Sequence, residues 1–156
     1  VISYEDALRL ISENIAPLAV EEVALQDAAG RVLGRDVSAR EDLPPFDNSA
    51  MDGYAVRLED CLGAAPESPI LLSVREIVRA GAAGGSRLNP GEAIRIMTGA
   101  PLPEGAEAVV MQEHTCLAGQ GRVGIQHAPR SRANIRRHGE DIRSGEKILD
   151  VGFGSG

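Results

Sequence analysis

The sequence predicts a mainly β protein with one helix near its N-terminal end and a complex, twisted, barrel-like sheet. A helical period of apolar residues occurs only near the start, and many short β-branched or alternating runs follow it. Clusters of Gly, Pro and Asn separate these runs, as turns separate the strands of all-β folds. Aromatic residues make up only 3% of the 156 residues while 43% are hydrophobic. We therefore expect an aliphatic core.

The segment SYEDALRLISENI, residues 3–15, predicts an amphipathic helix. Ser3 is a suitable N-cap, and Glu5 and Asp6 would place acids in the first turn. Asn14 marks its end, with Pro17 shortly after. The apolar positions follow the helical period and are Tyr4, Ala7, Leu8, Ile11 and Ile15.

The runs that follow the helix predict short strands. Two of them, 21–25 and 31–39, are joined by residues that predict a turn or a single helical turn. The others are the segment that begins at Tyr54 and four later runs rich in Val and Ile. We expect these strands within residues 54–60, 69–81, 91–97, 107–115 and 121–127.

The charge and the cysteines exclude several classes of function. A net charge of −7 argues against nucleic-acid and membrane-surface partners, and no apolar run approaches the roughly 20 residues of a membrane-spanning helix. We expect a soluble, cytoplasmic protein. Cys61 and Cys116 lack metal-ligand spacing, so free thiols in a reducing compartment are expected and zinc is disfavoured. The glycine-rich segments lack the lysine of a phosphate-binding P-loop.

The stretch PPFDNSAMDGYAV carries two acids in one short polar run. Asp47 and Asp52 flank Asn48 and Ser49, and Gly53 follows. One interpretation is structural: the side chains accept hydrogen bonds from nearby backbone N–H groups in two successive turns, and Gly53 supplies a positive φ. The other is functional: carboxylates on a rigid turn bind a metal or activate a hydroxyl. The residues alone leave both open.

The stretch IRIMTGAPLPEGAEAVVMQE predicts two strands joined by a proline-rich loop. Thr98 and Gly99 lie where the first strand ends, so a hydroxyl and an N–H are available to a phosphate or another ligand oxygen. A proline-stiffened turn with a threonine cap is the structural alternative.

The stretch RSRANIRRHGEDIRSGE gathers cations just before two acids. It indicates either an anion site beside a carboxylate or ion pairs on a solvated face. No Ser or Cys partner for its histidine is evident, so triad chemistry has no support. The charged residues are Arg130, Arg132, Arg136, Arg137, His138, Glu140 and Asp141.

The order of these three motifs resembles the N-terminal half of the molybdopterin molybdenumtransferase family, which includes the bacterial MoeA proteins and the E domain of gephyrin. The resemblance runs from the helix to about Val151. It implies an enzyme that inserts molybdenum from molybdate into adenylylated molybdopterin and releases AMP, with a divalent metal, Mg²⁺, assisting. It also implies a homodimer with its active cleft between the β-rich domain of one subunit and an α/β domain of the other.

The resemblance also assigns roles to residues of the three motifs. By motif, Asp52, Thr98 and Asp141 correspond to functionally important polar residues of the family. Three separated segments would then converge on one wall of the cleft, where Asp52 and Asp141 suit Mg²⁺ with substrate phosphate oxygens. For substrate binding we expect Asn48, Ser49, Arg136 and Arg137. No residues are assigned to the metal itself.

The resemblance implies two domains that are discontinuous in sequence. Residues 1–20, 39–47 and 135–156 would form an extended, linker-like α/β domain I, and residues 21–38 and 48–134 a β-rich domain II. The family's catalytic α/β domain and C-terminal β domain would be absent, so we read the chain as a fragment that is inactive alone.

A second hypothesis is a dimerisation or scaffolding module without a catalytic role. It predicts that the polar motif residues are replaceable, whereas the apolar face formed by Ile2, Ala7, Leu8, Ile11 and Ile15 matters. A glycosidase with paired acids is disfavoured because the aromatic platforms typical of sugar sites are lacking.

Overall fold

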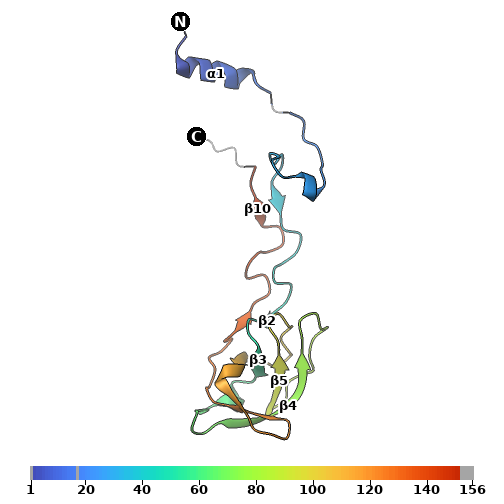
Figure 1. The fold of residues 1–156 in the computed structure, drawn as a ribbon, viewed down its shortest axis with the longest axis vertical. Coiled ribbons are helices and arrows are strands. Elements are labelled where there is room, and N and C mark those ends of the chain that lie inside the picture. The colour runs from blue at the N-terminus through green and yellow to red at the C-terminus, as the bar shows by residue number, and fades with distance from the viewer. Residues whose placement is uncertain (1, 17, 152–156) are drawn as a thin grey trace. The chain divides into compact units, whose positions relative to one another are not determined.

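The computed structural model describes residues 2–16 and 18–151, and the chain falls into two compact units (Figure 1). Unit 1 combines the N-terminal residues up to Val37 with those from Lys147 onward, and unit 2 runs from Ser38 to Glu146. The boundaries predicted for domains I and II differ from this division and stay a prediction. A mainly β chain with one N-terminal helix is confirmed.

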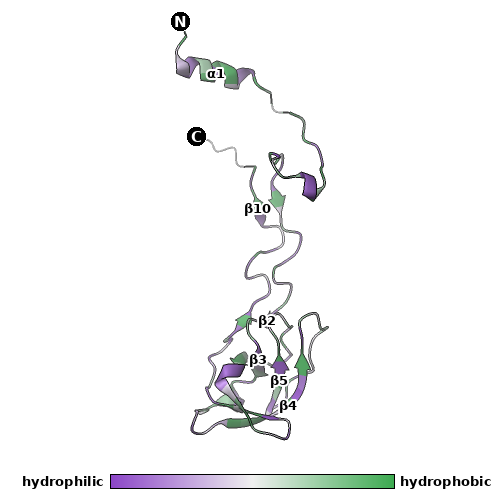
Figure 2. Cartoon of the chain, viewed as in Figure 1, coloured by the Kyte–Doolittle hydropathy of each residue, from purple (hydrophilic) through white to green (hydrophobic). Residues whose placement is uncertain are grey.

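The helix of unit 1, α1 (Tyr4–Asn14), forms where the apolar period predicted it. Ser3 is its N-cap: the backbone N–H of Asp6 donates to Ser3 Oγ at 3.1 Å, which satisfies one of the free N–H groups of the first turn. None of its residues is buried. Figure 2 shows both apolar and polar residues along this helix. Its large apolar side chains are exposed within the described chain, namely those of Tyr4, Leu8, Leu10 and Ile11.

The prediction of strands at 21–25 and 31–39 is largely wrong. Residues 21–24 form no strand, and of the second segment only β1 (Val37–Ser38) does, paired with β10 (Lys147–Leu149). Local apolar alternation cannot build a strand without a neighbour to complete its backbone hydrogen bonds. The single helical turn expected nearby is present as a 3₁₀ turn, Leu25–Asp27.

Unit 2 is built on a six-stranded sheet that curls into an open, barrel-like shape (Figure 1). Its strand order is β6-β3-β5-β4-β8-β7, and all pairs are antiparallel except β4 with β5. Its strands are β3 (Gly53–Val56), β4 (Ile70–Val78), β5 (Glu92–Ile96), β6 (Ala108–Met111), β7 (Thr115–Leu117) and β8 (Arg122–Ile125). The five strands expected from residue 54 onward are therefore present. The sequence did not predict β7 as a strand distinct from β6.

Three smaller pieces complete unit 2. A two-stranded ladder joins β2 (Asn48–Ser49) to β9 (Ile135–Arg136), and two 3₁₀ turns span Glu59–Cys61 and Gln112–His114. The ladder joins the first polar motif to the third.

The core of unit 2 is aliphatic, as predicted. One cluster of buried side chains contains Val56, Val123 and Ile125, and another contains Ile94 and Val109. Buried branched side chains of this kind account for most of the stability of a small domain.

Both cysteines of unit 2 are free thiols, as expected. Cys61 is buried and Cys116 is half-buried.

Among the described residues, every helix is too short or too polar to cross a lipid bilayer.

Candidate functional site

The three polar motifs lie side by side in unit 2. β2 pairs with β9 on one side, with Asn48 opposite Arg136. On its other side, Ser49 N donates to Ala100 O at 3.0 Å and Gly99 N donates to Ser49 O at 2.8 Å. The segment that begins with β2 therefore lies between the loop that follows β5 and the cationic third motif.

Asp52 and Thr98 meet directly at the end of this segment. Asp52 Oδ1 accepts hydrogen bonds from both the backbone N and the Oγ1 of Thr98, each at 2.8 Å. The Thr98 backbone N–H, then its hydroxyl, then the nearby charge of Arg95 lower the pKa of Asp52 below its usual value. Both residues are exposed, so an ionised, fixed carboxylate faces solvent at this point.

The geometry also leaves one oxygen of Asp52 open. Both Thr98 donors bind Oδ1, and Oδ2 has no hydrogen-bond partner within the described part of the chain. A carboxylate with one oxygen anchored and one open can accept a proton or bind a cation without rotating away.

The turn before Asp52 is rigid because its polar side chains are buried and bonded locally. Ser49 is fully buried; its Oγ donates to Met51 O at 2.5 Å and accepts from Met51 N at 3.2 Å. Asn48 is 5% exposed and its Nδ2 donates to Phe46 O at 3.3 Å. Asn48 Oδ1 is the one buried side-chain oxygen or nitrogen of the described residues that has no partner. Ser49 thus makes the local turn contacts of the structural interpretation, whereas Asp47 and Asp52 accept hydrogen bonds from residues distant in sequence.

Gly53 is not needed for a positive φ, which its place after a turn had suggested. It is part of β3, and a Cβ at this position would lie 2.1 Å from Val110 O of the neighbouring strand β6. The residue is not among those with positive φ in the described chain. Glycine is required here because two backbones approach closely.

Asp47 ties the first motif to the third. Its Oδ1 accepts from the backbone N of His138 at 2.8 Å, and its Oδ2 accepts from Arg132 Nη2 at 2.5 Å. The His138 N–H is the main cause that lowers the pKa of Asp47, followed by the hydrogen bond from Arg132 and then the charges of Arg132 and Arg137. Asp47 therefore holds together two segments about 90 residues apart, a role that its turn context did not reveal.

Asp141 lies with the cations of its own motif. Arg136 forms ion pairs with both Asp141 and Glu140, and the Arg137 backbone N donates to Glu140 Oε2 at 2.8 Å. The Asp141 backbone N donates to Leu43 O at 3.0 Å. The structure thus brings Asp52 together with Thr98, and Asp141 together with Arg136. Their shared place in one cleft wall stays a prediction.

A second group of polar side chains lies next to Asp52. Arg95 Nη1 donates to Tyr54 Oη at 3.0 Å and Arg95 Nη2 donates to Gln112 Oε1 at 2.6 Å, while the Gln112 backbone N donates to Asp52 O at 3.1 Å. Sequence reasoning missed this group. The signal was present: Arg95 interrupts the apolar strand AIRIM with a charge on a half-buried position.

The described residues form no metal centre in advance of substrate binding. Residues 2–16 and 18–151 contain no group of three or more His, Cys, Asp and Glu side chains placed to hold an ion. Asp141 has a guanidinium partner already. The open oxygen of Asp52 fits Mg²⁺ as a single carboxylate ligand, since this ion commonly takes its other ligands from water and substrate phosphate.

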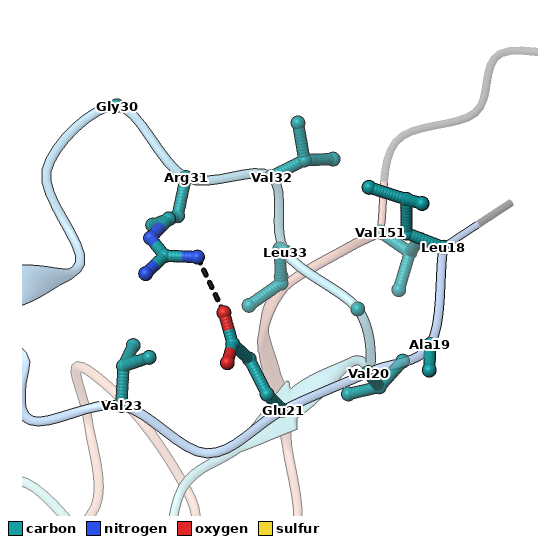
Figure 3. A pocket seen from close by; sticks show the side chains of 11 residues that line it. Leu18, Ala19, Val20, Glu21, Val23, Gly30, Arg31, Val32, Leu33 and Val151 are labelled. Carbon is teal, nitrogen blue, oxygen red and sulfur yellow. Dashed lines mark hydrogen bonds and ion pairs between the residues drawn. The ribbon is translucent and has the colours of Figure 1, made fainter.

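Unit 1 contains a separate hollow of about 530 Å³ (Figure 3). The close-up shows mostly aliphatic side chains, with an ion pair of 2.5 Å between Arg31 and Glu21 across it. No residue of the three polar motifs lines it, and it brings no acid–base pair to a reacting position. The aliphatic lining comprises Leu18, Ala19, Val20, Val23, Val32, Leu33 and Val151.

Comparison with known proteins places this arrangement in a family. The family model of the MoeA N-terminal region (domain I and II) matches residues 2–153. Molybdopterin molybdenumtransferase 2 of Mycobacterium tuberculosis (strain H37Rv) is 45% identical over 150 residues, which cover 96% of this chain and 37% of the relative. Molybdopterin molybdenumtransferase of Haemophilus influenzae is 41% identical over 144 residues, covering 92% and 34%.

A solved structure supports the same assignment. The molybdopterin biosynthesis moeA protein from Pyrococcus horikoshii OT3 superposes with a TM-score of 0.88 at 39% identity, covering 96% of this chain and 39% of that one. The chain thus spans between a third and two fifths of the length of these relatives. The predicted resemblance is confirmed: the chain belongs to the MoeA family and corresponds to its N-terminal region.

Proposed function

We propose that this chain is the N-terminal part of an enzyme of molybdenum cofactor biosynthesis, which inserts molybdenum from molybdate into adenylylated molybdopterin and releases AMP. Support comes from the family model and from relatives named molybdopterin molybdenumtransferase. The single observation that carries the proposal is the Asp52–Thr98 pair, because it holds an ionised carboxylate at the surface where the first and second motifs meet.

In this proposal Asp52 is the acid that faces the reacting phosphate. Thr98 fixes its Oδ1, so Oδ2 can bind a divalent cation that arrives with the substrate. Mg²⁺ on that oxygen would polarise the phosphoanhydride and stabilise the charge that develops on the leaving AMP.

The third motif would bind the anionic parts of the substrate. Arg136 is held by Glu140 and Asp141, which fixes the direction of its guanidinium. The Arg137 guanidinium makes no hydrogen bond within the described part of the chain, so its donors are available to a phosphate or to molybdate. Asp141 would then act by positioning Arg136. Buried Asn48 and Ser49 would act by shaping the turn rather than by touching the substrate.

The rest of the active cleft would come from elsewhere in the assembly. We propose a cytoplasmic homodimer in which an α/β domain of the partner subunit faces Asp52. These residues alone would then be inactive, because the facing α/β domain that completes the cleft is needed for the reaction.

The alternative function is dimerisation or scaffolding alone, favoured by one observation. α1 has no buried residue, and its apolar residues Leu8 and Ile11 are 47% and 55% exposed. Such a face is typical of a surface that another chain covers.

Two sets of variants in the full-length protein separate the hypotheses. Asp52→Asn and Asp141→Asn test the enzyme, and Leu8→Ser with Ile11→Ser tests the scaffold. The enzyme proposal expects loss of molybdenum cofactor formation in the first set, with unfolding transitions like those of the parent. If both acid variants keep parental activity while only the helix variants fail, the scaffold proposal stands instead.

A further inference from the structure

We propose that Arg95, Tyr54 and Gln112 form a phosphate-binding subsite beside Asp52. The identity of the phosphate, that of the adenylylated substrate, rests on the proposed function. The subsite itself rests on the side chains around Arg95.

The guanidinium of Arg95 is held rigidly by neutral groups. Its Cζ lies 5.1 Å from the centroid of the Tyr54 ring, and its two Nη atoms donate to Tyr54 Oη and Gln112 Oε1. Two strands and a 3₁₀ turn supply these contacts, since Tyr54 on β3 pairs with Arg95 on β5 and Gln112 begins the turn after β6. A guanidinium fixed in this way loses little side-chain entropy when it binds an anion.

The positive charge of Arg95 has no carboxylate partner of its own. Within the described residues, no Asp or Glu oxygen lies within 4.0 Å of its nitrogen atoms. Two of its five N–H groups are used by Tyr54 and Gln112, which leaves three for a ligand. By contrast, Arg75 on the neighbouring strand β4 forms an ion pair with Glu92 at 2.8 Å. A half-buried arginine that binds only neutral acceptors is suited to receive an external anion.

The space for such an anion is present. A shallow hollow of about 390 Å³ opens over Arg95, and a single phosphate group needs only part of that volume. Its lining consists of Tyr54, Arg95, Gln112, Glu113, Thr115 and Leu117. Glu113 is an acid in this lining, and Asp52 adjoins it through Gln112, whose backbone N donates to Asp52 O at 3.1 Å.

The presence of both a cation and acids at the subsite favours one class of ligand over others. Arg95 favours an anion, whereas Glu113 and Asp52 repel a bare polyanion. A phosphate that carries a divalent cation satisfies all three, because the cation meets a carboxylate and the phosphate oxygens meet the guanidinium. We therefore infer a phosphate ester or phosphoanhydride with its Mg²⁺, whose phosphate binds the guanidinium of Arg95.

The test is a titration of the full-length protein with AMP in the presence of Mg²⁺, followed by NMR. Because other domains can bind nucleotides too, the shifts of the backbone amides of Gln112 and Thr98 are followed rather than total binding. Adenosine, which lacks the phosphate, is the control ligand. We expect AMP but not adenosine to shift these amides in the parent.

Three variants complete the experiment. Arg95→Gln should raise the AMP concentration at half-saturation of these shifts about tenfold, and Arg95→Lys should raise it less, because a point charge remains without the planar fork. Arg122→Gln, an exposed arginine at the start of β8, should behave like the parent. Unchanged titration of Arg95→Gln, or equal shifts with adenosine, would overturn the subsite.

Failure of the phosphate subsite can be distinguished from failure of the proposed enzyme function. If Asp52→Asn abolishes cofactor formation while Arg95→Gln binds AMP normally, the enzyme proposal stands and the subsite falls. If the subsite binds AMP through Arg95 but Asp52→Asn leaves activity intact, the subsite stands and the role of Asp52 falls.

Discussion

Thr98 holds Asp52 through two donors on the same oxygen: its backbone N and its Oγ1 each lie 2.8 Å from Asp52 Oδ1. Residues 46 positions apart in the chain thereby form one unit of the site. A substitution at position 98 can remove the hydroxyl and keep the backbone donor, so the contribution of the hydroxyl can be tested by itself.

Thr98→Val removes the hydroxyl but keeps the backbone donor. The pKa of Asp52 should then rise part of the way to its ordinary value, and Thr98→Ser should leave it lowered. The measurement is a titration of the Asp52 carboxyl followed by NMR. In the full-length protein we expect the valine variant to form cofactor about tenfold more slowly than the serine variant, as for the loss of a bond to an ionised group. Equal pKa values in the two variants would show that the hydroxyl does not hold the carboxylate.

Asp47→Asn should weaken the link between the first and third motifs. The asparagine still accepts a hydrogen bond, but the charge that attracts the His138 N–H and Arg132 is lost, so we expect a loss of roughly 1–2 kcal/mol in the free energy of unfolding at pH 7. Urea denaturation measures it. Glu67→Gln, at an exposed turn, is the matched control and should unfold like the parent.

The same variant predicts a pH dependence. Because the pKa of Asp47 is lower in the folded state than in the unfolded chain, its stabilisation is present above the unfolded value of about 4 and is lost as the pH falls through the folded value. The difference in unfolding free energy between the parent and Asp47→Asn should therefore shrink below about pH 4. A difference that stays constant down to the acid transition would contradict the assignment.

Gly53→Ala should be severely destabilising. Its Cβ would lie 2.1 Å from Val110 O, and a backbone atom cannot move away without separating β3 from β6. We expect a loss of about 3 kcal/mol or more, or failure to fold. Gly63→Ala is the control: a Cβ there meets nothing within 4 Å, and only its positive φ of 80° costs about 1 kcal/mol. Similar transition midpoints for the two variants would refute the close approach.

The two cysteines should differ sharply in reactivity. Burial raises the pKa of the Cys61 thiol to about 11, with the neighbouring charge of Asp60 as a second cause, whereas Cys116 is partly accessible. Iodoacetamide at pH 8 should therefore label Cys116 first and Cys61 only after denaturation, as peptide mass spectrometry can show. Labelling of Cys61 at the same rate in the folded protein would contradict its burial.

The sequence predicted those parts of the fold whose signals are local. α1 follows from its apolar period and from Ser3, and the long strands β4 and β5 follow from their Val and Ile content. The segment 21–25 looked equally strand-like but forms none, because a strand depends on a partner that local alternation does not reveal.

The site was predictable in its residues but not in its connections. The meeting of Asp52 with Thr98 agrees with the motifs, whereas the bonds of Asp47 to Arg132 and His138 join positions 85 and 91 residues apart. Long-range contacts of this kind depend on the whole topology. Arg95 was overlooked because a lone charge in a strand more often faces solvent; its contacts with Tyr54 and Gln112 are visible only in the folded chain.

In the proposed enzyme, Asp52 is the acid on the reacting side of the molybdenum-insertion cleft. The most direct measurement is the rate of molybdenum cofactor formation from adenylylated molybdopterin and molybdate by full-length Asp52→Asn, with Glu67→Gln as the control. We expect a loss of about 100-fold or more in Asp52→Asn, within the range of positioned acid–base groups, with an unchanged unfolding transition. A folded Asp52→Asn protein that forms cofactor at the rate of the control would contradict the claim and leave residues 47–52 as a well-bonded turn.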